Sequence, residues 1–448
     1  MDMRLKHRKE TQAKRKTQLC RVYSLKLDRS HLNLEQKEFL RKLFLEAKWF
    51  YNYLLSHKKI KDANTNARIV PVMLHDKSFE DRALNALSSS SRQGLQNRVF
   101  SSIKTLSTLK KQGKKIGHLR FKARVESVPL PATGIHGCYQ IFRDSNQIHV
   151  AKAPKWFRVR GMDQIPSNAE FASANLISRN KDYYLNVTCF FNKDEQYIEK
   201  QRTLYRERKG KAIGLDFGCT TQLTGFDNSD QAVKIEFAVP IDKRLRRLHR
   251  KVSRKLERKK TKKDRRDSKN RIKDRLRMRR RYEYLSNVKR DIRNKLVHAL
   301  TTNYEIIVVQ DENIKGWQAG GHGKKIQATG IGGIMAALRS KAHTLVEVDR
   351  FAPTTKTCSM CGSIRKMEQQ DRVYECECGA GMDRDVNAAR NILTLGLIKD
   401  RVPTERRESA LGETQTTTDN LTDRLRLIPR VVCKPGSLNQ EAPAFRRG

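Results

Sequence analysis

The stretches CSMCG (residues 358–362) and CECG (residues 376–379) bring four cysteines together just before MDRDVNAARNIL, residues 382–393. Each cysteine pair is followed by a glycine, which permits a tight turn. Two thiolate pairs on facing turns form the tetrahedral four-sulfur environment that zinc favours. The candidate ligands are Cys358, Cys361, Cys376 and Cys378. Because the protein supplies all four ligands, we expect a structural zinc site.

Other roles for these four cysteines fit their spacing less well. They could be redox thiols or small buried side chains, but paired C-x-x-C and C-x-C motifs are typical of zinc sites. The remaining cysteines are scattered along the chain and do not pair by spacing: Cys20, Cys138, Cys189, Cys219 and Cys433. No secretory signal is recognisable at the N-terminus, so we do not expect a disulfide framework.

The charge of the chain indicates a polyanionic partner. Among 448 residues, 94 are Lys or Arg and 48 are Asp or Glu, which gives a formal net charge of +46. Nucleic acid is the polyanion that this excess fits best. A membrane surface is the alternative, but no apolar run is long enough to span a bilayer. We therefore expect a soluble, intracellular protein that binds nucleic acid. As its location we take the cytoplasm of a prokaryote, in association with the nucleoid.

The first half of the sequence predicts a strand-rich module with a helical insertion. Residues 1–19 form a basic arm that we expect to be partly disordered, and residues 20–27 alternate like a strand. Apolar residues recur at helical spacing over residues 33–57 and 79–110. Strand patterns return within residues 138–195, and residues 201–211 have the composition of a linker.

The second half alternates buried strands with helices. Residues 212–228 predict two strands around a turn at Gly218, residues 305–313 a buried strand, and residues 330–342 a helix. Residues 243–281 hold 23 basic residues against 4 acids, and their sparse apolar residues predict one helix with a thin buried seam. A second helix is predicted over residues 285–299, and residues 401–448 read as a flexible tail.

Two aspartates occupy positions that suggest metal-dependent chemistry. Asp216 lies inside the hydrophobic strand IGLDFG, where a charge needs a partner or a metal. Asp385 lies at a helix start and shares a helical face with Ala388, Ala389 and Ile392, so we expect it to point inward. Asp383 is in phase with Asn387, Arg390 and Thr394, which we expect to form the polar face, and we expect Asp383 to be the helix N-cap.

A third acid is expected on the strand IIVVQDEN. Gln310 and Glu312 share one strand face, and Asp311 points away. Three carboxylates from two strands and a helix could hold two Mg²⁺ ions for phosphodiester cleavage. Each acid taken alone could equally be a cap or an ion-pair partner; all three together beside a basic helix favour the metal site.

These motifs resemble those of the TnpB proteins of insertion sequences and their relatives, the compact type V CRISPR effectors. GLDFG is similar to the first segment of the family's RuvC nuclease domain and IIVVQDENIKGW to the second. The stretch CSMCG…CECGAGMDRDVNAARNIL is similar to its zinc knuckle and third segment, and is the most specific of these matches. NLEQKEFLRKLFLEAKWFYNYLL resembles the family's first recognition helices and KKIGHLRFK its basic loop.

The resemblance implies a multidomain α+β fold with an RNase H-like RuvC domain, a zinc-knuckle insertion, and an N-terminal β-rich wedge domain that carries a helical recognition insertion. The implied domains are residues 1–35 (arm and first part of the wedge), 36–124 (recognition), 125–204 (rest of the wedge), 205–350 (RuvC segments I and II), 351–381 (zinc-binding insertion), 382–400 (RuvC segment III) and 401–448 (tail).

The resemblance also implies an activity: Mg²⁺-dependent, RNA-guided cleavage of double-stranded DNA beside a short target-adjacent motif, with a guide RNA as partner. Asp216 and Asp385 fall on the family's catalytic aspartates. The family usually has Glu where this chain has Gln310, and we take Glu312 as a relocated ligand because an acid on that face is what the chemistry needs. The expected nucleic-acid contacts are Lys114, Lys115, Arg120, Lys122, Arg244, Arg247, Lys251, Arg254, Lys255 and Arg258.

Three alternatives stay open. The second-segment acid could be lost, which would leave an RNA-guided DNA-binding repressor that does not cleave. The protein could be a CRISPR-associated type V effector and not a transposon-encoded one. It could also be a guide-independent zinc protein that binds RNA or DNA, although that reading leaves the buried acids unexplained.

Overall fold

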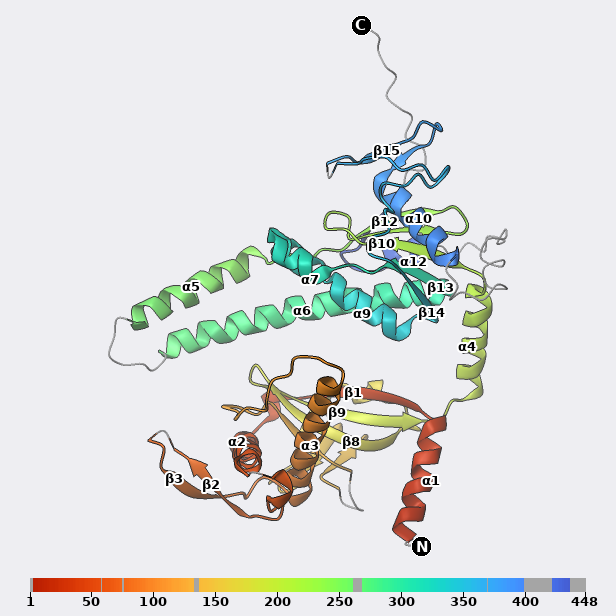
Figure 1. Ribbon diagram of the computed structural model, residues 1–448. Coiled ribbons are helices and arrows are strands. Elements are labelled where there is room, and N and C mark those ends of the chain that lie inside the picture. The colour runs from red at the N-terminus through yellow and green to blue at the C-terminus, as the bar shows by residue number, and fades with distance from the viewer. Residues whose placement is uncertain are drawn as a thin grey trace. The chain divides into compact units, whose positions relative to one another are not determined.

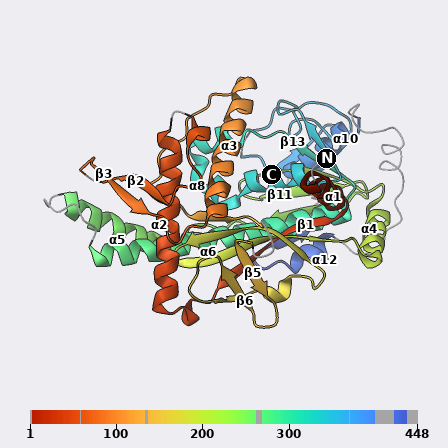
Figure 2. The same cartoon turned by 90° about the horizontal axis from the view of Figure 1, so that it is seen from below.

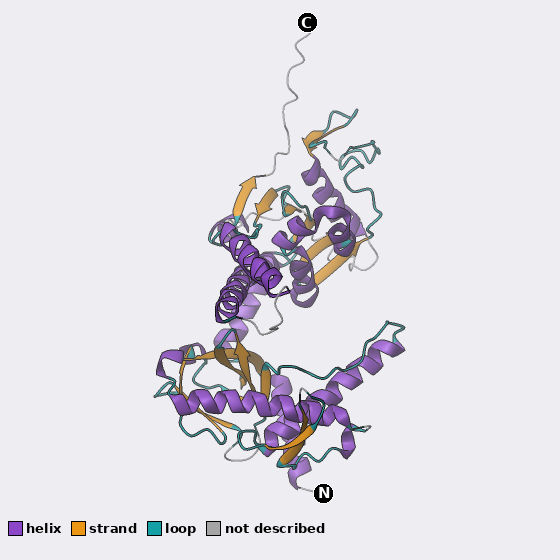
Figure 3. Ribbon diagram, turned by 90° about the vertical axis from the view of Figure 1, so that its left-hand side faces the viewer, coloured by secondary structure: helices purple, strands orange, loops and turns teal. Residues whose placement is uncertain are grey.

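The computed structural model describes residues 3–57, 59–74, 76–132, 137–260, 268–368, 370–398 and 421–435. The chain divides into two compact units, Met1–Glu195 and Gln196–Gly448. In each unit a sheet, orange in Figure 3, is flanked by helices, purple in the same view. Among the helices of the described ranges, none is both long enough and apolar enough to cross a membrane.

The first unit is built on an antiparallel sheet of seven strands in the order β4-β8-β9-β1-β7-β6-β5. Its long central strands have alternating side chains, of which one set is buried; Leu25 faces Leu185 across β1 and β9. The strands predicted for residues 20–27 and within 138–195 are confirmed. Their bounds are β1 Leu19–Leu27, β4 Ser127–Leu130, β5 Tyr139–Phe142, β6 Gln147–Val150, β7 Phe157–Arg160, β8 Glu170–Arg179 and β9 Asp182–Phe191.

Two long helices, α2 (Leu34–Ser56) and α3 (Ser89–Lys111), pack against each other in this unit (Figure 2). Asn33 begins α2 with a capping box, in which its side chain and that of Gln36 each bond the other's backbone N–H. The same core contains the short hairpin of β2 (Ile69–Met73) and β3 (Phe79–Ala83) and three single-turn helices. These turns are η1 Arg29–His31, η2 Ile60–Asp62 and η3 Met162–Gln164.

Two predictions for the first unit are wrong. The basic arm is a helix, α1 (Met3–Thr17), and its last turn is held to the sheet: Lys14 pairs with Glu170 at 2.6 Å, and Arg15 lies 4.5 Å from the ring centre of Phe190. The helix predicted from residue 79 begins ten residues later, because residues 79–83 pair with β2 instead. None of the five side chains of β3 is buried, and even Phe79 is exposed, so no apolar alternation marks this strand in the sequence.

The second unit has a six-stranded mixed sheet in the order β14-β13-β10-β11-β12-β17. Strands β10, β11, β12 and β17 are antiparallel neighbours, whereas β13 and β14 run parallel to β10. The bounds are β10 Ala212–Asp216, β11 Leu223–Asp227, β12 Ala232–Glu236, β13 Ile306–Gln310, β14 Thr344–Val348 and β17 Val432–Pro435. The carboxyl ends of β10, β13 and β14 therefore meet at one edge of the sheet.

Helices cover both faces of this sheet (Figure 1). One face packs on α6 (Lys269–Asn303), α9 (Ile331–Lys341) and α12 (Leu421–Arg426), and the other on α10 (Arg384–Ile398). The remaining helices are α4 Glu195–Arg208, α5 Lys243–Lys260, α7 Ile314–Trp317, the π-helical turn η4 Gln318–His322, and α8 Gly323–Thr329. A small hairpin of β15 (Val373–Glu375) and β16 (Gly381–Asp383) precedes α10.

Several predictions for the second unit need correction. The single helix expected over residues 243–281 is two helices, α5 and α6, side by side in a hairpin (Figure 1) that is joined by the ion pairs Lys255–Asp274 and Asp242–Arg281. The expected linker at residues 201–211 mostly belongs to helix α4. The expected flexible tail contributes α12 and the edge strand β17 within residues 421–435; the rest of the tail lies outside the described residues.

Candidate active site and metal centre

Helix α10 approaches the sheet closely where it crosses β10 and β13. A Cβ added to Gly214 would lie 2.3 Å from the carbonyl oxygen of Ala389 and 2.6 Å from the Leu393 nitrogen. A Cβ on Gly396 would lie 2.2 Å from Cγ1 of Val308. Since real contacts of this kind are not that short, both positions require glycine. This approach brings the first turn of α10, with Asp385, to the edge where β10 ends at Asp216.

The acids at this edge influence one another electrostatically. Burial, followed by the negative charges of Asp385 and Glu312, raises the pKa of Asp216 to about 8. Burial and the neighbouring Asp311 raise the pKa of Glu312 to about 7, although Arg350 opposes the shift. Three carboxyl groups, from β10, from the segment after β13 and from the start of α10, are therefore close enough to interact electrostatically, although their oxygen atoms do not all lie within 4.8 Å of one another. A divalent cation would relieve their repulsion, so the donor set fits Mg²⁺.

Two cations that the sequence did not single out accompany these acids. Arg384 Nε lies 3.6 Å from Asp385 Oδ1, and its charge lowers the pKa of Asp216 against the larger upward effects. Arg350 pairs with Asp311, which turns that acid away from the other three toward Arg350 and Arg339. The expectation that Asp311 points elsewhere is thus met in the structure. Of these two arginines, only Arg384 could have been found from the sequence, because it directly precedes the candidate acid Asp385 at the start of α10.

Gln310 has a structural task that explains why it is not an acid. Its side-chain amide donates to the carbonyl oxygens of Asp349 (3.0 Å), Arg350 (3.3 Å) and Ala352 (3.0 Å). Its Oε1 accepts from the Thr354 hydroxyl at 3.0 Å. A carboxylate here could not donate to the three carbonyl groups. The buried Gln310 amide therefore clamps the loop 349–354 that leads from β14 into the cysteine region.

The same loop is tied to α10 by two buried asparagines. Asn391 Nδ2 donates to the carbonyl oxygens of Thr354 (2.8 Å) and Thr357 (2.7 Å). Asn387 donates to Thr357 O at 2.8 Å and accepts from the Ser359 N–H at 3.0 Å. We expected Asn387 on the polar face of the helix, and this is wrong: it is fully buried. Two asparagines four residues apart on an otherwise apolar helix were the available signal.

Asp383 begins helix α10, as predicted. Its Oδ1 accepts from the backbone N–H groups of Asp385 (3.0 Å) and Val386 (3.3 Å), which is N-cap geometry. Its other carboxylate oxygen pairs with Lys234 on β12. This pair fixes the start of α10 against the sheet and leaves Asp385, two residues on, to face the other acids.

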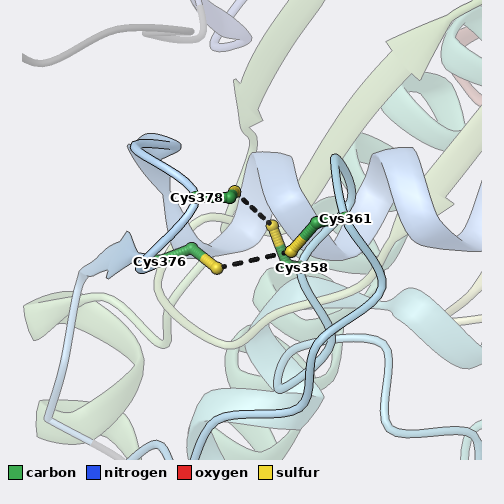
Figure 4. A group of neighbouring side chains, drawn as sticks. All are labelled: Cys358, Cys361, Cys376 and Cys378. Carbon is green, nitrogen blue, oxygen red and sulfur yellow. Dashed lines mark hydrogen bonds between the residues drawn. The ribbon is translucent and has the colours of Figure 1, made fainter.

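The four cysteines form the candidate metal centre (Figure 4). Their side chains converge, with Sγ–Sγ separations of 3.8 Å for Cys358–Cys378 and 3.6 Å for Cys361–Cys376. A tetrahedron with Zn–S bonds of about 2.3 Å has sulfurs about 3.8 Å apart, so the set could hold zinc. Within the described ranges, no other group of three or more His, Cys, Asp or Glu has its ligand atoms all within 4.8 Å of one another.

The local fold of the cysteine region explains this geometry. Gly362 and Gly379 take positive φ values of 79° and 87°, and their N–H groups donate to Cys358 O and Cys376 O in matching turns. Hydrogen bonds from Ser363 lower the pKa of Cys361 to about 6, which favours the thiolate. The strand β15 lies between the two cysteine pairs, and its buried Tyr374 donates to Lys356 O at 3.1 Å.

The predicted nucleic-acid contacts fall on two surfaces, one in each unit. On α5, Arg244, Arg247, Lys251 and Arg254 are exposed and spaced along one helical face. Lys255 instead has an internal partner, Asp274, and the Arg258 side chain lies outside the described residues. In the first unit, the four predicted contacts on the loop after α3 are all exposed: Lys114, Lys115, Arg120 and Lys122.

Two stretches of this chain match models of known protein families. Residues 195–318 match a family model described as "Probable transposase" (OrfB_IS605), and residues 335–392 match the Cas12f1-like TNB domain. A "TnpB-like protein L79" of Acanthamoeba polyphaga mimivirus is 30% identical over 141 residues, which is 27% of this chain and 25% of that protein. The resemblance to TnpB proteins is confirmed. A Streptomyces pristinaespiralis protein named "Putative RNA-guided DNA endonuclease" is 34% identical over 113 residues, which is 24% of this chain and 28% of that protein.

These curated relatives are thus matched over about a quarter of their length. Solved structures of compact CRISPR effectors match more of the chain at lower identity. A Cas12f1–sgRNA–target DNA complex overlaps 84% of this chain and 99% of its own, with 13% identity and a TM-score of 0.45. The effector CRISPR-Cas_phi3 overlaps 85% and 92%, with 10% identity and a TM-score of 0.38. The chain is a mixed α+β protein related to TnpB proteins, with a cysteine cluster able to hold zinc.

Proposed function

We propose that this protein is an RNA-guided DNA endonuclease with one Mg²⁺-dependent site made of Asp216, Glu312 and Asp385. The observation that carries the proposal is the meeting of these three carboxyl groups at one edge of the sheet, where the charges of two raise the pKa of the third. A buried acid whose pKa is raised by neighbouring carboxylates is typical of functional sites, including catalytic metal centres.

Mg²⁺ bound there would activate a water for attack on the phosphodiester and stabilise the leaving oxygen. The residues of the chain organise that site. Gly214 leaves room for α10 to approach the sheet, and Asp383 caps the start of that helix. Asp385 is thereby held near Asp216. Arg384 offers a positive charge beside the acids, where a phosphate group would lie.

The strand order supports an RNase H-like nuclease domain. Three antiparallel strands, β10 to β12, are followed by β13 and β14 parallel to the first, and α10 covers the face on which Asp216 lies. In this proposal the cysteine region is an insertion between β14 and α10, and the first unit supplies the wedge and recognition domains. The domain bounds expected from the sequence remain our proposal, as do double-stranded target DNA and a target-adjacent motif.

The exposed basic face of α5 supports a nucleic-acid channel. Positive charges repeated along one helix face contact phosphates irrespective of sequence. Base pairing with a guide RNA would then supply the sequence specificity. The basic loop of the first unit, from Lys114 to Lys122, is the second proposed contact surface.

One observation supports a second candidate function. Gln310 stands where TnpB proteins usually have an acid, so the chain could bind guided targets and repress without cutting. The hydrogen bonds of Gln310 favour a cleaving enzyme over a repressor. The Gln310 amide binds the loop 349–354, and Glu312 supplies a carboxyl group whose charge raises the pKa of Asp216. A CRISPR-associated effector is the other alternative, and it would use the same site.

The test is to express the chain with its flanking locus and to sequence the RNA that purifies with it. The complex is then incubated with Mg²⁺ and plasmids that carry a guide-matched target beside randomised bases. We expect linear plasmids that share one flanking motif. Motif-dependent binding without cutting would mean that the protein acts by occupancy. Binding without dependence on the guide would favour a general nucleic-acid-binding zinc protein.

A further inference from the structure

Phe351 is an exposed aromatic side chain on a rigid loop. It is 86% exposed, the highest value among the large hydrophobic side chains of the described residues. Its own N–H donates to Asp349 Oδ1 at 2.8 Å, and Thr354 N–H donates to Ala352 O at 2.8 Å. The Gln310 amide holds the carbonyl groups on both sides of it. The backbone is thus fixed while the ring is left in water.

The loop that carries this ring borders the acidic site. It follows β14, whose last residue, Val348, pairs with Gln310 and accepts from the Asp311 N–H at 3.0 Å. Arg350, directly before Phe351, pairs with Asp311, and its charge is felt by Glu312. An aromatic ring and a guanidinium group therefore lie on adjacent residues of this loop, next to the segment after β13 that carries Glu312.

Unpaired nucleic-acid bases are the ligands that suit such a ring. Aromatic side chains stack on bases of any sequence, and single-strand sites combine this stacking with cations that follow the phosphates. A single exposed phenyl group is unremarkable on most surfaces. Here its backbone is held by a buried amide that also borders the cleavage site, and the chain carries a net charge of +46 that favours a polyanion.

We propose that Phe351 is a stacking platform for an unpaired base of the strand that enters the Asp216–Glu312–Asp385 site, and that it holds the neighbouring phosphate over the acids. This inference rests on the proposed function and adds a residue that touches the substrate. The base is recognised by its aromatic face, so we expect little sequence preference at this position.

The direct test uses a single-stranded DNA oligonucleotide with one 2-aminopurine, whose fluorescence falls when it stacks. The full chain carries Asp385→Asn so that the strand stays uncut. Phe351→Ala should remove more than half of the quenching and weaken binding by about tenfold. Phe351→Trp should restore both. Leu427→Ala, which removes another exposed apolar side chain of the same unit (83% exposed), should change neither.

The outcomes separate this inference from the proposed nuclease activity. Quenching that depends on Phe351, in a protein whose intact acids never cut DNA, would keep the stacking site and reject the nuclease. Unchanged quenching and affinity in Phe351→Ala would overturn the inference even if the wild-type protein cleaves its target. Equal zinc content and melting temperature of the two alanine variants would show that neither effect comes from misfolding.

Discussion

Gln310 and Glu312 perform different tasks two residues apart on the same segment. The Gln310 amide holds three carbonyl groups of the loop 349–354, and Glu312, past the end of β13, contributes its charge to the acidic site. The alternation of strand side chains predicts that both residues share one face, but β13 ends at Gln310, so Glu312 lies beyond the strand. The alternation could not predict the clamp, because the carbonyl groups belong to a loop about forty residues later in the chain.

Gln310→Glu should destabilise the protein and should not improve cleavage. The new carboxylate would face three carbonyl oxygens in a buried place, and losing such donors leaves the partners unsatisfied at about 1–3 kcal/mol each. We expect a fall of at least about 2 kcal/mol in the free energy of unfolding by denaturant titration. The exposed Gln318→Glu is the control and should change little. A Gln310→Glu variant that is as stable as wild type and cuts faster would show that the acid was simply lost.

Asp216→Asn should stabilise the metal-free protein at high pH. The raised pKa of Asp216, about 8 against a usual 3.8, means that the folded state holds a proton that the unfolded state has lost. The stability that this proton contributes is fully present below about pH 4 and is lost as the pH rises through about 8. Asparagine carries no such charge. In Mg²⁺-free buffer, the melting temperature of the variant should exceed that of wild type by a few degrees at pH 8.5, and the gap should shrink toward pH 4. A gap that does not change with pH would contradict the buried-acid account.

At the scale of elements, the approach of α10 to β10 and β13 sets the geometry of the site. Gly214 and Gly396 permit this approach, and the asparagines of α10 then hold the loop that leads to the cysteines. The strands and the inward face of α10 were predictable, because apolar alternation and helical spacing directly record burial. The division of residues 243–281 into α5 and α6 was not predictable, since the sequence between the two helices is as rich in basic residues as the helices themselves. The N-cap Ser268, which accepts from Arg271 N at 3.2 Å, was the overlooked signal.

Gly214→Ala should move α10 and impair cleavage. The added Cβ would overlap the backbone of Ala389 and Leu393, which cannot yield without a shift of the helix and of Asp385. We expect cleavage to fall at least about tenfold, as for a positioning error at a reacting centre, while zinc remains bound. Gly332→Ala on α9 is the control: its Cβ would meet nothing closer than 3.8 Å, and alanine favours the helix. Equal activity of the two variants would mean that the close approach is unimportant.

At the scale of the whole molecule, a series of hydrogen bonds connects the cysteine cluster to Gln310, two residues before Glu312. These hydrogen bonds run from Gln310 through Thr354 to Asn391. Asn387, on the same helix, extends the series to Ser359, which is next to Cys358. The sequence predicted the cysteine set and its turns because the ligand spacing is local. Its attachment to α10 became visible only in the structure, since the partners are backbone carbonyl groups.

Removing zinc should therefore disturb more than the cysteine region. We expect about one zinc per chain by elemental analysis, and Cys376→Ser should lower that content and also speed hydrogen exchange at residues 354–359. Cys20→Ser, on the exposed side of β1, is the control and should leave both unchanged. Full zinc loss with undisturbed exchange and activity would show that the two sites are independent.

The most direct measurement of the central claim is the Mg²⁺-dependent cleavage rate of Glu312→Gln beside that of Asp311→Asn. The two variants remove adjacent charges, but only Glu312 contributes its charge to Asp216, whereas Asp311 is engaged by Arg350 and Arg339. Losing a metal ligand worth several kcal/mol should slow Glu312→Gln by about 10² or more while guided DNA binding persists. Asp311→Asn should stay within about tenfold of wild type. Cleavage by Glu312→Gln at the wild-type rate would contradict the assignment.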